Sequence, residues 1–314
     1  MHTQSIQALI TGVLQGEVQA IARTISLIEN EHPRSDEILN ALYAHVGKAY
    51  RIGITGPPGA GKSTLTAQIT RHYRKKGKTV GIIAVDPTSP FTGGAVLGDR
   101  IRMSEFATDP GVFIRSMASR GSMGGLARRT QDAGDVLDAA GKDVIIYETV
   151  GVGQTELDIA EAADTTVVVL VPESGDAIQA MKAGLMEIAD IFVVNKADRE
   201  GAERIKIELD LMLQLRPSQR PWEPPILMTV AYKGEGIENL IEKMGQHWHF
   251  LSREAELLKR RKQRMIKKIH ELIQKRLNEH FWTPKRKEKF NALVENNLLE
   301  YSPYEVLETL FNIE

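Results

Sequence analysis

Hydrophobic and polar positions divide the chain into three regions with different periodicity. Between residues 49 and 248, short apolar runs alternate with stretches of helical periodicity. Most of these runs are continuously apolar, which is typical of parallel strands that helices cover on both faces. We therefore predict a doubly wound, mainly parallel α/β sheet. Its expected strands are residues 50–55, 79–85, 112–116, 144–148, 165–171, 191–194 and 226–230.

The two flanking regions show helical periodicity only. Residues 1–48 read as amphipathic helices that are interrupted near Pro33. Beyond residue 249 a segment rich in lysine and arginine carries two adjacent apolar rows, which are Leu258, Met265, Ile269 and Leu272, and Ile266, Ile273 and Leu277. One apolar stripe favours packing on the chain's own core or on a partner over binding to nucleic acid. We expect an N-terminal helical extension (1–48), a nucleotide-binding domain (49–248) and a C-terminal helical arm (249–314).

Composition excludes several broad classes of protein. Hydrophobic residues make up 42% of the 314 residues and charged residues 26%, which is unlike a disordered or fibrous chain. A formal net charge of −1 gives no long-range attraction to nucleic acid or to an anionic membrane. The chain has no cysteine, so thiolate metal sites are excluded. The apolar runs are too short to cross a bilayer, and acidic residues near the N-terminus argue against a transit peptide. We expect a cytoplasmic protein.

The first expected strand leads directly into GPPGAGKST, which matches the P-loop pattern GxxxxGK[ST] in a strand–loop–helix context. In such a loop, backbone N–H groups and the dipole of the following helix surround the phosphates. Lys62 would contact the β- and γ-phosphates, and the Ser63 hydroxyl would ligate Mg²⁺. This pattern alone predicts a nucleoside triphosphate and magnesium, without choosing among GTPases, ATPases and small-molecule kinases. The loop residues are Gly56, Pro57, Pro58, Gly59, Ala60, Gly61, Lys62, Ser63 and Thr64.

The sixth expected strand ends in Asn-Lys-Ala-Asp, an NKxD motif at residues 195–198. The Asp198 carboxylate would accept hydrogen bonds from the ring N–H and the 2-amino group of guanine. Adenine would leave these groups unpaired, at a cost on the order of a few kcal/mol. Asn195 would brace the loop, and the Lys196 stem would lie over the base. Ala231, after the next strand, either donates its N–H to the guanine carbonyl or lies in a plain turn. These features select GTP and GDP.

The fourth expected strand leads into Glu-Thr-Val-Gly at residues 148–151, where many GTPases have Asp-x-x-Gly. Glu148 would hold a magnesium-bound water, and the Gly151 N–H would sense the γ-phosphate. Asp86 and Asp99 border a stretch rich in glycine and threonine that we expect to cover the nucleotide. Both are candidate magnesium ligands, direct or through water, or groups that position the attacking water. For Asp99 a helix cap is an open alternative.

Two further features do not decide which residues catalyse hydrolysis. Arginines in residues 115–130 would touch either phosphate or a partner, and the sequence does not choose between them. Gln154 lies near the place of the catalytic glutamine of Ras-like proteins, but a structural role is an equal alternative. A sparsely equipped site predicts slow intrinsic hydrolysis that a partner completes or accelerates.

Taken together, GPPGAGKST, VDPTSPFTGGAVLGDR, RGSMGGL, ETVGVGQTE and NKAD resemble the MeaB/ArgK family of P-loop GTPases. The resemblance covers the whole chain. It implies a chaperone that uses GTP to gate cofactor loading, protection and repair of an adenosylcobalamin-dependent acyl-CoA mutase, with methylmalonyl-CoA mutase as the expected client. It also implies a homodimer joined through the C-terminal helices. Finally, it implies that Lys182, in a partner-responsive loop at 173–187, moves toward the nucleotide when the mutase binds. Without the resemblance, Lys182 is a solvated helix lysine.

Some observations bear on the partner and on rival functions. Glu173 and Ser174 stand where many family members have alanine and glycine, and Ser122 stands where they have histidine. These departures put the identity of the partner in question more than the nucleotide chemistry.

Three alternative functions can be weighed against the GTPase chaperone. One alternative is an ATP-dependent kinase linked to transport, which the NKxD motif disfavours. Another is a metallochaperone GTPase, which would show cysteine or histidine clusters. The histidines are scattered except for His247 and His249, which we expect at the surface. A third alternative is a scaffold protein that binds GTP without hydrolysing it.

Overall fold

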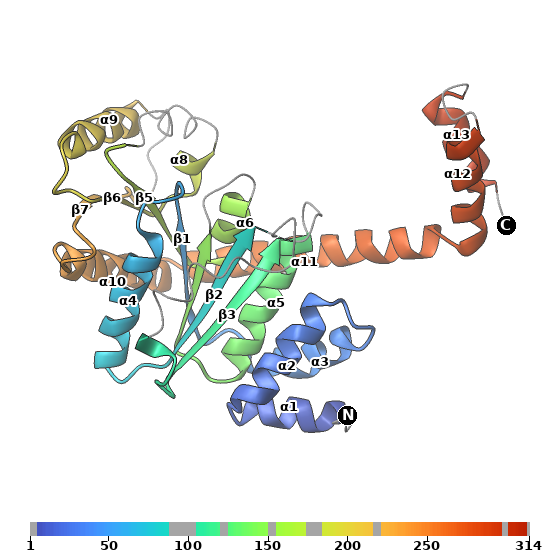
Figure 1. The fold of residues 1–314 in the computed structure, drawn as a ribbon, viewed down its shortest axis with the longest axis horizontal. Helices are drawn as coiled ribbons and strands as arrows, with labels where there is room; N and C mark the ends of the chain where they lie inside the picture. The colour runs from blue at the N-terminus through green and yellow to red at the C-terminus, as the bar shows by residue number, and fades with distance from the viewer. Residues whose placement is uncertain are drawn as a thin grey trace. The chain divides into compact units, whose positions relative to one another are not determined.

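The computed structural model describes residues 5–87, 105–119, 125–149, 155–173, 184–215, 221–296 and 301–312. Seven strands in these residues form one parallel sheet in the order β3-β2-β4-β1-β5-β6-β7 (Figure 1). They are β1 (Tyr50–Thr55), β2 (Val80–Pro87), β3 (Val112–Ser119), β4 (Val144–Thr149), β5 (Thr165–Leu170), β6 (Ile191–Asn195) and β7 (Ile226–Thr229). The predicted parallel α/β fold is therefore confirmed, because each expected strand forms at or near its predicted bounds.

Helices cover both faces of the sheet, which explains the continuously apolar strands. Strands β1, β4, β5 and β6 are buried along their whole length. One face packs against α4 (Lys62–Lys75) and α10 (Ile237–Arg253). The other face packs against α5 (Gly125–Ala139) and α6 (Thr155–Ala162), and against α9 (Ala202–Gln214) beside β5 and β6. Strand β1 lies between β4 and β5, so the strand order reverses at the place where a doubly wound sheet forms its binding crevice.

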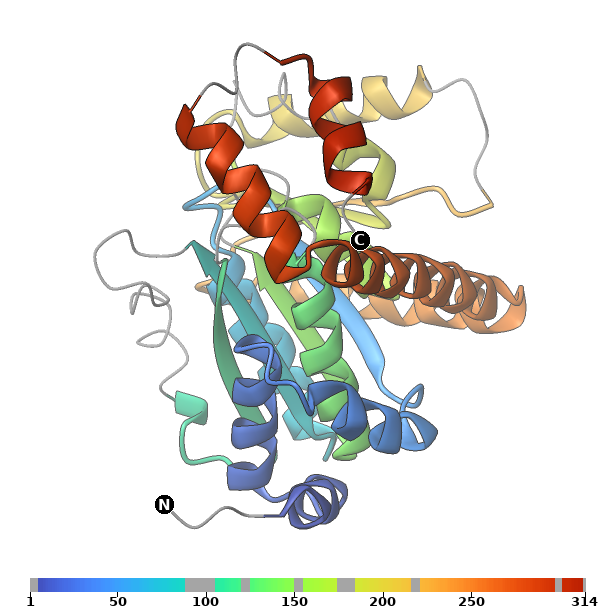
Figure 2. The same cartoon turned by 90° about the vertical axis from the view of Figure 1, so that its right-hand side faces the viewer.

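The N-terminal helices belong to the same hydrophobic core as the sheet. Helices α1 (Ile6–Leu14), α2 (Val18–Glu29) and α3 (Ser35–Leu42) pack beside α5, as Figures 1 and 2 show. Ile21 and Ile38 are fully buried in one cluster with Val136 and Leu137 of α5. A short 3-10 turn, Tyr43–His45, then leads to β1. The helical extension expected for residues 1–48 is thus helical, and it shares its core with the α/β domain.

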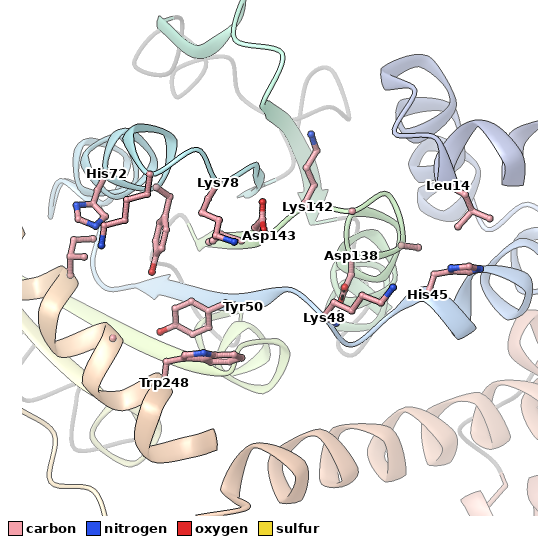
Figure 3. A pocket seen from close by; sticks show the side chains of 17 residues that line it. Leu14, His45, Lys48, Tyr50, His72, Lys78, Asp138, Lys142, Asp143 and Trp248 are labelled. Atoms are coloured by element: carbon pink, nitrogen blue, oxygen red, sulfur yellow. Dashed lines mark hydrogen bonds and ion pairs between the residues drawn. The ribbon is translucent and has the colours of Figure 1, made fainter. Parts of the chain in front are cut away.

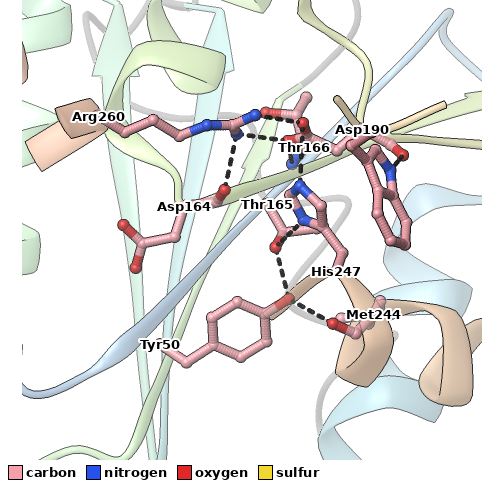
Figure 4. A network of polar contacts seen from close by, with 9 residues as sticks. Tyr50, Asp164, Thr165, Thr166, Asp190, Met244, His247 and Arg260 are labelled. Atoms are coloured by element: carbon pink, nitrogen blue, oxygen red, sulfur yellow. Dashed lines mark hydrogen bonds and ion pairs between the residues drawn. The ribbon is translucent and has the colours of Figure 1, made fainter. Parts of the chain in front are cut away.

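Two features lie at the edge where the strands begin. The first is a cavity of about 750 Å³ beside the first residues of β1 and β4 (Figure 3). The second is a buried polar network that joins β1, β5 and β6 to α10 and to Arg260 (Figure 4). Both lie away from the carboxyl ends of the strands, where ligands of open α/β sheets ordinarily bind.

The buried network centres on Asp190, which directly precedes β6 and is 5% exposed. Arg260 donates both guanidinium N–H groups to the Asp190 carboxylate at 2.9 and 2.8 Å. His247 is fully buried, with Nε2 3.3 Å from Asp190 Oδ1 and Nδ1 2.8 Å from the Thr165 hydroxyl. The Tyr50 hydroxyl donates to Thr165 at 2.6 Å. Our expectation of a surface position for His247 was wrong, because the residue occupies the inner face of α10; His249 is exposed as expected.

The structure divides the chain into compact units at residues 1–260 and 261–314. The boundary expected at 248/249 lies inside α10, which continues to Arg253. The α/β unit extends further because Leu251 is fully buried in it and because Arg260 is paired with Asp190. A basic segment read from sequence alone gives no sign of this buried pairing.

The second unit contains most of α11 (Glu256–Phe281), together with α12 (Pro284–Asn296) and α13 (Pro303–Phe311). Arg286 donates to the carbonyl oxygens of Leu310 and Phe281 at 2.9 and 3.0 Å, and the rings of Phe281 and Phe311 lie 4.7 Å apart. Helix α13 begins with a capping box formed by Ser302 and Glu305. The predicted apolar stripe lies on α11. That a second copy of the chain covers this stripe in a homodimer stays a prediction.

Within the described residues, no helix combines the length and the apolar character that a bilayer-spanning segment needs.

Candidate nucleotide site

The P-loop connects the end of β1 to the start of α4 and depends on glycine at two places. Gly56 has φ 136°, and a Cβ there would lie 2.0 Å from the carbonyl oxygen of Val169 on β5. Gly61 has φ 85°, and a Cβ there would lie 2.4 Å from the Asn195 side-chain nitrogen. Only glycine satisfies both the backbone conformation and the close approach. The loop is therefore seated directly on the strands that carry the rest of the site.

Lys62 is the first residue of α4, and its ammonium is turned back over the loop. Its Nζ donates to the carbonyl oxygens of Gly56 and Pro57 at 2.7 and 2.8 Å, and the residue is 6% exposed. No side chain caps the N-terminus of α4, whose N-cap is Gly61. A helix N-terminus beside a buried ammonium attracts anions. The loop can therefore receive phosphate groups.

Glu148 lies beside the P-loop because the register of β1 and β4 pairs Ile54 with Glu148. The Ser63 hydroxyl donates to Glu148 Oε1 at 2.5 Å, and the Thr66 hydroxyl donates to Oε2 at 2.7 Å. The three polar residues are at most 5% exposed. Two hydroxyl donors thus hold an acidic side chain against the first turn of α4.

Ser63 and Glu148 supply oxygen atoms of the kind that Mg²⁺ prefers as ligands. Mg²⁺ prefers oxygen ligands, and in phosphate-binding sites it takes only one or two of them from the protein, the rest from water and substrate. A hydroxyl and a carboxylate oxygen in contact beside the P-loop supply that donor set. Within the described residues no cluster of three or more histidine or acidic residues could hold a metal ion. The magnesium role of these residues stays a prediction.

Asn195 connects three loops at the carboxyl end of the sheet. Its side-chain nitrogen donates to the carbonyl oxygen of Ala60 in the P-loop at 2.8 Å. Its side-chain oxygen accepts from the Thr229 hydroxyl and from the Ala231 N–H, both at 3.1 Å. The bracing expected of Asn195 is thus present. The Ala231 N–H already has a partner, so a contact with guanine would have to share or replace this hydrogen bond.

Asp198 lies in the same group of loops and contacts two residues that the sequence pattern did not single out. The Tyr232 hydroxyl donates to Asp198 Oδ2 at 2.8 Å, and Lys233 Nζ lies 3.8 Å from the same oxygen. The hydrogen bond from Tyr232, aided by Lys233 and Arg199, holds the pKa of Asp198 below its ordinary value. An ionised carboxylate accepts hydrogen bonds only, as guanine recognition requires. Both residues follow Ala231 directly, but no motif marks them.

The other predicted residues divide into those that the structure describes and those that it does not. Lys196 has a left-handed φ of 56°, which costs a non-glycine residue about 1 kcal/mol or more and occurs at constrained functional loops. Asp99, Gly151 and Lys182 lie outside the described residues, and so does the side chain of Asp86. The remaining predicted residues gather where β1, β4, β6 and β7 end. This edge is where parallel α/β sheets bind ligands.

Comparisons with known proteins identify the family to which this chain is similar. The family model described as "Methylmalonyl Co-A mutase-associated GTPase MeaB" matches residues 21–286. A GTPase of Pyrococcus abyssi is 54% identical over 271 residues, which cover 85% of this chain and 84% of that protein. The mouse methylmalonic aciduria type A homolog is 34% identical over 296 residues, which cover 88% of this chain and 71% of that protein. The crystal structure of a LAO/AO transport system kinase has a TM-score of 0.73 and 27% identity, covering 99% and 97% of the two chains.

Proposed function

The chain belongs to the MeaB family of GTPases, and we propose that it hydrolyses GTP to GDP and phosphate in a magnesium-dependent reaction. The observation that carries this proposal is the 2.5 Å contact between Ser63 and Glu148 beside the P-loop. At the other end of the site, Asp198 is positioned in its ionised form. The two ends provide for the phosphates and for the base of one nucleotide.

At the phosphate end, Lys62 and the N-terminus of α4 would bind the β- and γ-phosphates. Ser63 and Glu148 would hold Mg²⁺, directly or through water, with Asp86 and Asp99 as further expected ligands. The ion would neutralise charge that develops on the phosphate oxygens during hydrolysis. The hydroxyl of Thr66 fixes the Glu148 carboxylate in place for this task.

At the base end, Asp198 would accept hydrogen bonds from the ring N–H and the 2-amino group of guanine. A carboxylate has about four acceptor positions, so the Tyr232 hydroxyl can keep its hydrogen bond while guanine is bound. Asn195 would keep the base loops in register with the P-loop through its contact with Ala60. An ATP-dependent enzyme has no use for this carboxylate, which argues against the transport-linked kinase.

We further propose that the partner is an adenosylcobalamin-dependent acyl-CoA mutase, and that GTP turnover gates loading, protection and repair of its cofactor. The description of the matching family and the name of the mouse relative support methylmalonyl-CoA mutase as the client. A homodimer formed through the C-terminal helices belongs to the same proposal. Lys182 would add positive charge beside the nucleotide when the mutase binds.

The test is GTP hydrolysis by the purified protein, alone and with an adenosylcobalamin-dependent acyl-CoA mutase from the same organism. We expect slow hydrolysis by the protein alone and stimulation by about tenfold or more with the mutase. ATP should not be hydrolysed, and Lys182→Ala should lose the stimulation but keep the basal rate. A rate that no mutase changes would remove the client proposal and leave the GTPase proposal standing. Preference for ATP would favour the kinase instead.

A further inference from the structure

The cavity at the amino-terminal edge of the sheet has no role in the proposed GTPase reaction. Its volume of about 750 Å³ lies within the range of pockets that bind small molecules. Its walls come from the first residues of β1 and β4, the end of α4 and the middle of α10. Nucleotide bound in the P-loop would lie at the opposite ends of these strands. Any ligand in the cavity would therefore occupy a second, separate site.

One end of the cavity is built from aromatic side chains. The rings of Tyr50 and Trp248, which Figure 3 labels, lie 4.5 Å apart at an interplanar angle of 48°, and Tyr73 also lines the cavity. Burial raises the pKa of Tyr73 to about 12, so its phenol stays neutral. His72 lines the wall as well, and its buried Nε2 has no hydrogen-bond partner among the described residues. This end offers aromatic faces for a flat ring.

The charges around the cavity leave an excess of positive charge. The two acidic residues in its lining already have cationic partners, since Asp138 accepts from Arg51 at 2.9 Å and Asp143 accepts from Lys78 at 2.9 Å. Lys48 and Lys76 also line the cavity, and within the described residues neither ammonium makes a hydrogen bond or ion pair. Lysine ammonium groups bind phosphate as point charges. The cavity is therefore suited to an anion.

Gly245 is a further sign that this space is kept open. It lies within the 17-residue helix α10 and lines the cavity. A Cβ at this position would meet no atom within 4 Å, so no packing contact requires glycine. Glycine in a helix interior costs roughly 0.5–1 kcal/mol relative to alanine. The residue thus lowers the stability of α10 and leaves room beside Trp248.

We propose that this cavity binds a small organic phosphate that carries a planar heterocyclic ring. The ring would lie against Tyr50, Tyr73 and Trp248, and the phosphates would be held by Lys76, with Lys48 at the far end. This proposal does not depend on the GTPase function, since its residues contribute nothing to the nucleotide site.

The experiment is equilibrium dialysis of radiolabelled ADP with the full-length protein, whose P-loop site is first filled with one equivalent of GDP and with Mg²⁺, so that no free GDP competes for the cavity. ADP supplies both the ring and the phosphates, while adenosine and pyrophosphate each supply one of them. We expect ADP to bind with a dissociation constant below the millimolar range, and each half molecule to bind about tenfold more weakly or worse. Lys76→Glu and Gly245→Leu should each weaken ADP binding by about tenfold or more.

Two matched variants separate this site from general effects of charge or helix sequence. Lys75→Glu makes the same charge change one residue away, and His249→Leu adds the same side chain elsewhere on α10; neither residue lines the cavity. Both should bind ADP as the unchanged protein does, and all four variants should keep their GTPase rate. The proposal is overturned if ADP does not bind. It is also overturned if Lys76→Glu and Gly245→Leu bind ADP normally, or if adenosine or pyrophosphate binds as tightly as ADP.

Discussion

The two edges of the central sheet are built on different principles. At the carboxyl edge, the polar groups come from strand ends, from the start of α4 and from loops, and their contacts join these parts, as in the Asn195 hydrogen bonds to Ala60 and Ala231. At the amino edge, a polar network lies between strands and helices, in which the buried carboxylate of Asp190 pairs with the half-buried Arg260. At the first edge the charged groups are placed to meet the proposed nucleotide, whereas the Asp190 network at the second edge holds helices on the sheet. Polar residues of the same types thus serve ligand binding in one group and architecture in the other.

The largest effect is expected at Glu148, at the carboxyl edge. Glu148→Gln keeps a hydrogen-bonding side chain but removes the charge that would support Mg²⁺, so we expect the GTPase kcat to fall by about a thousandfold. The magnesium concentration needed for half-maximal activity should rise as well. Phosphate release measured over a magnesium titration checks both values. Thr66→Ser, which keeps the second hydroxyl, is the control and should retain most of the activity. A nearly unchanged rate in Glu148→Gln would remove this residue from the reaction.

The amino edge should respond in stability rather than in catalysis. Arg260→Ala leaves the buried Asp190 carboxylate without its bidentate partner, and we expect the free energy of unfolding to fall by about 3 kcal/mol. Urea denaturation of the full chain measures this change, and Arg253→Ala, at an exposed position at the end of α10, is the matched control. GTP hydrolysis well below the melting temperature should be unaffected. If Arg260→Ala lost GTP hydrolysis while its free energy of unfolding stayed unchanged, the claim that this pair serves stability and not catalysis would be wrong.

The same pair makes a prediction about pH. Burial alone would raise the pKa of Asp190, but hydrogen bonds from His247 and Arg260 outweigh it and hold the pKa below its ordinary value. The stabilisation is therefore complete above the unfolded pKa of about 3.9 and is lost as pH falls through the lower, folded pKa. The stability difference between the unchanged protein and Arg260→Ala should be largest near pH 7 and shrink as the pH falls, because Asp190 in the variant, buried without Arg260, gains a proton at a higher pH than in the unchanged protein. A difference that grows on acidification would contradict this sign.

The smallest change in the free energy of unfolding is expected at Gly245. Substitutions of glycine should change this free energy in opposite directions at the two edges. Gly245→Ala at the amino edge should raise the free energy of unfolding by roughly 0.5–1 kcal/mol, because the new methyl group meets open space. Gly56→Ala at the carboxyl edge should lower it and abolish GTP binding, because the Cβ would lie 2.0 Å from a carbonyl oxygen of β5. Thermal unfolding of both variants tests the contrast. Two changes of the same sign would contradict it.

Much of the fold could be predicted from the sequence because its signals are local. Buried strands require continuous apolar runs, so the bounds of β1 were predicted to the residue and those of β3 were short by three residues at its end. The P-loop and NKxD motifs follow strands, and parallel strands end at one edge, so their residues were expected together. These residues group together because their strands are parallel and because each motif follows its strand along the chain. Both facts can be read from the hydrophobic pattern of the sequence.

The remaining features depend on contacts between residues far apart in the chain. His247 resembles any polar residue on an amphipathic helix until Asp190 and Thr165 are placed beside it. Tyr232 becomes a partner of Asp198 only when the loops after β6 and β7 meet. The basic segment around Arg260 gives no local sign that this arginine pairs with a buried aspartate. Sequence patterns therefore predicted the grouping of residues at the carboxyl edge and missed the contacts of the Asp190 network at the amino edge.

The most direct test of the account is the base specificity of Asp198→Asn. In this variant the carboxylate that would accept two hydrogen bonds from guanine becomes an amide, whose N–H can donate to the 2-carbonyl oxygen of xanthine. We expect GTP binding to weaken by about a hundredfold and xanthosine triphosphate to bind more tightly than GTP, as measured by competition with a fluorescent nucleotide. If Asp198→Asn binds GTP as the unchanged protein does and gains no affinity for xanthosine triphosphate, Asp198 does not read the base, and the guanine-specific site is wrong.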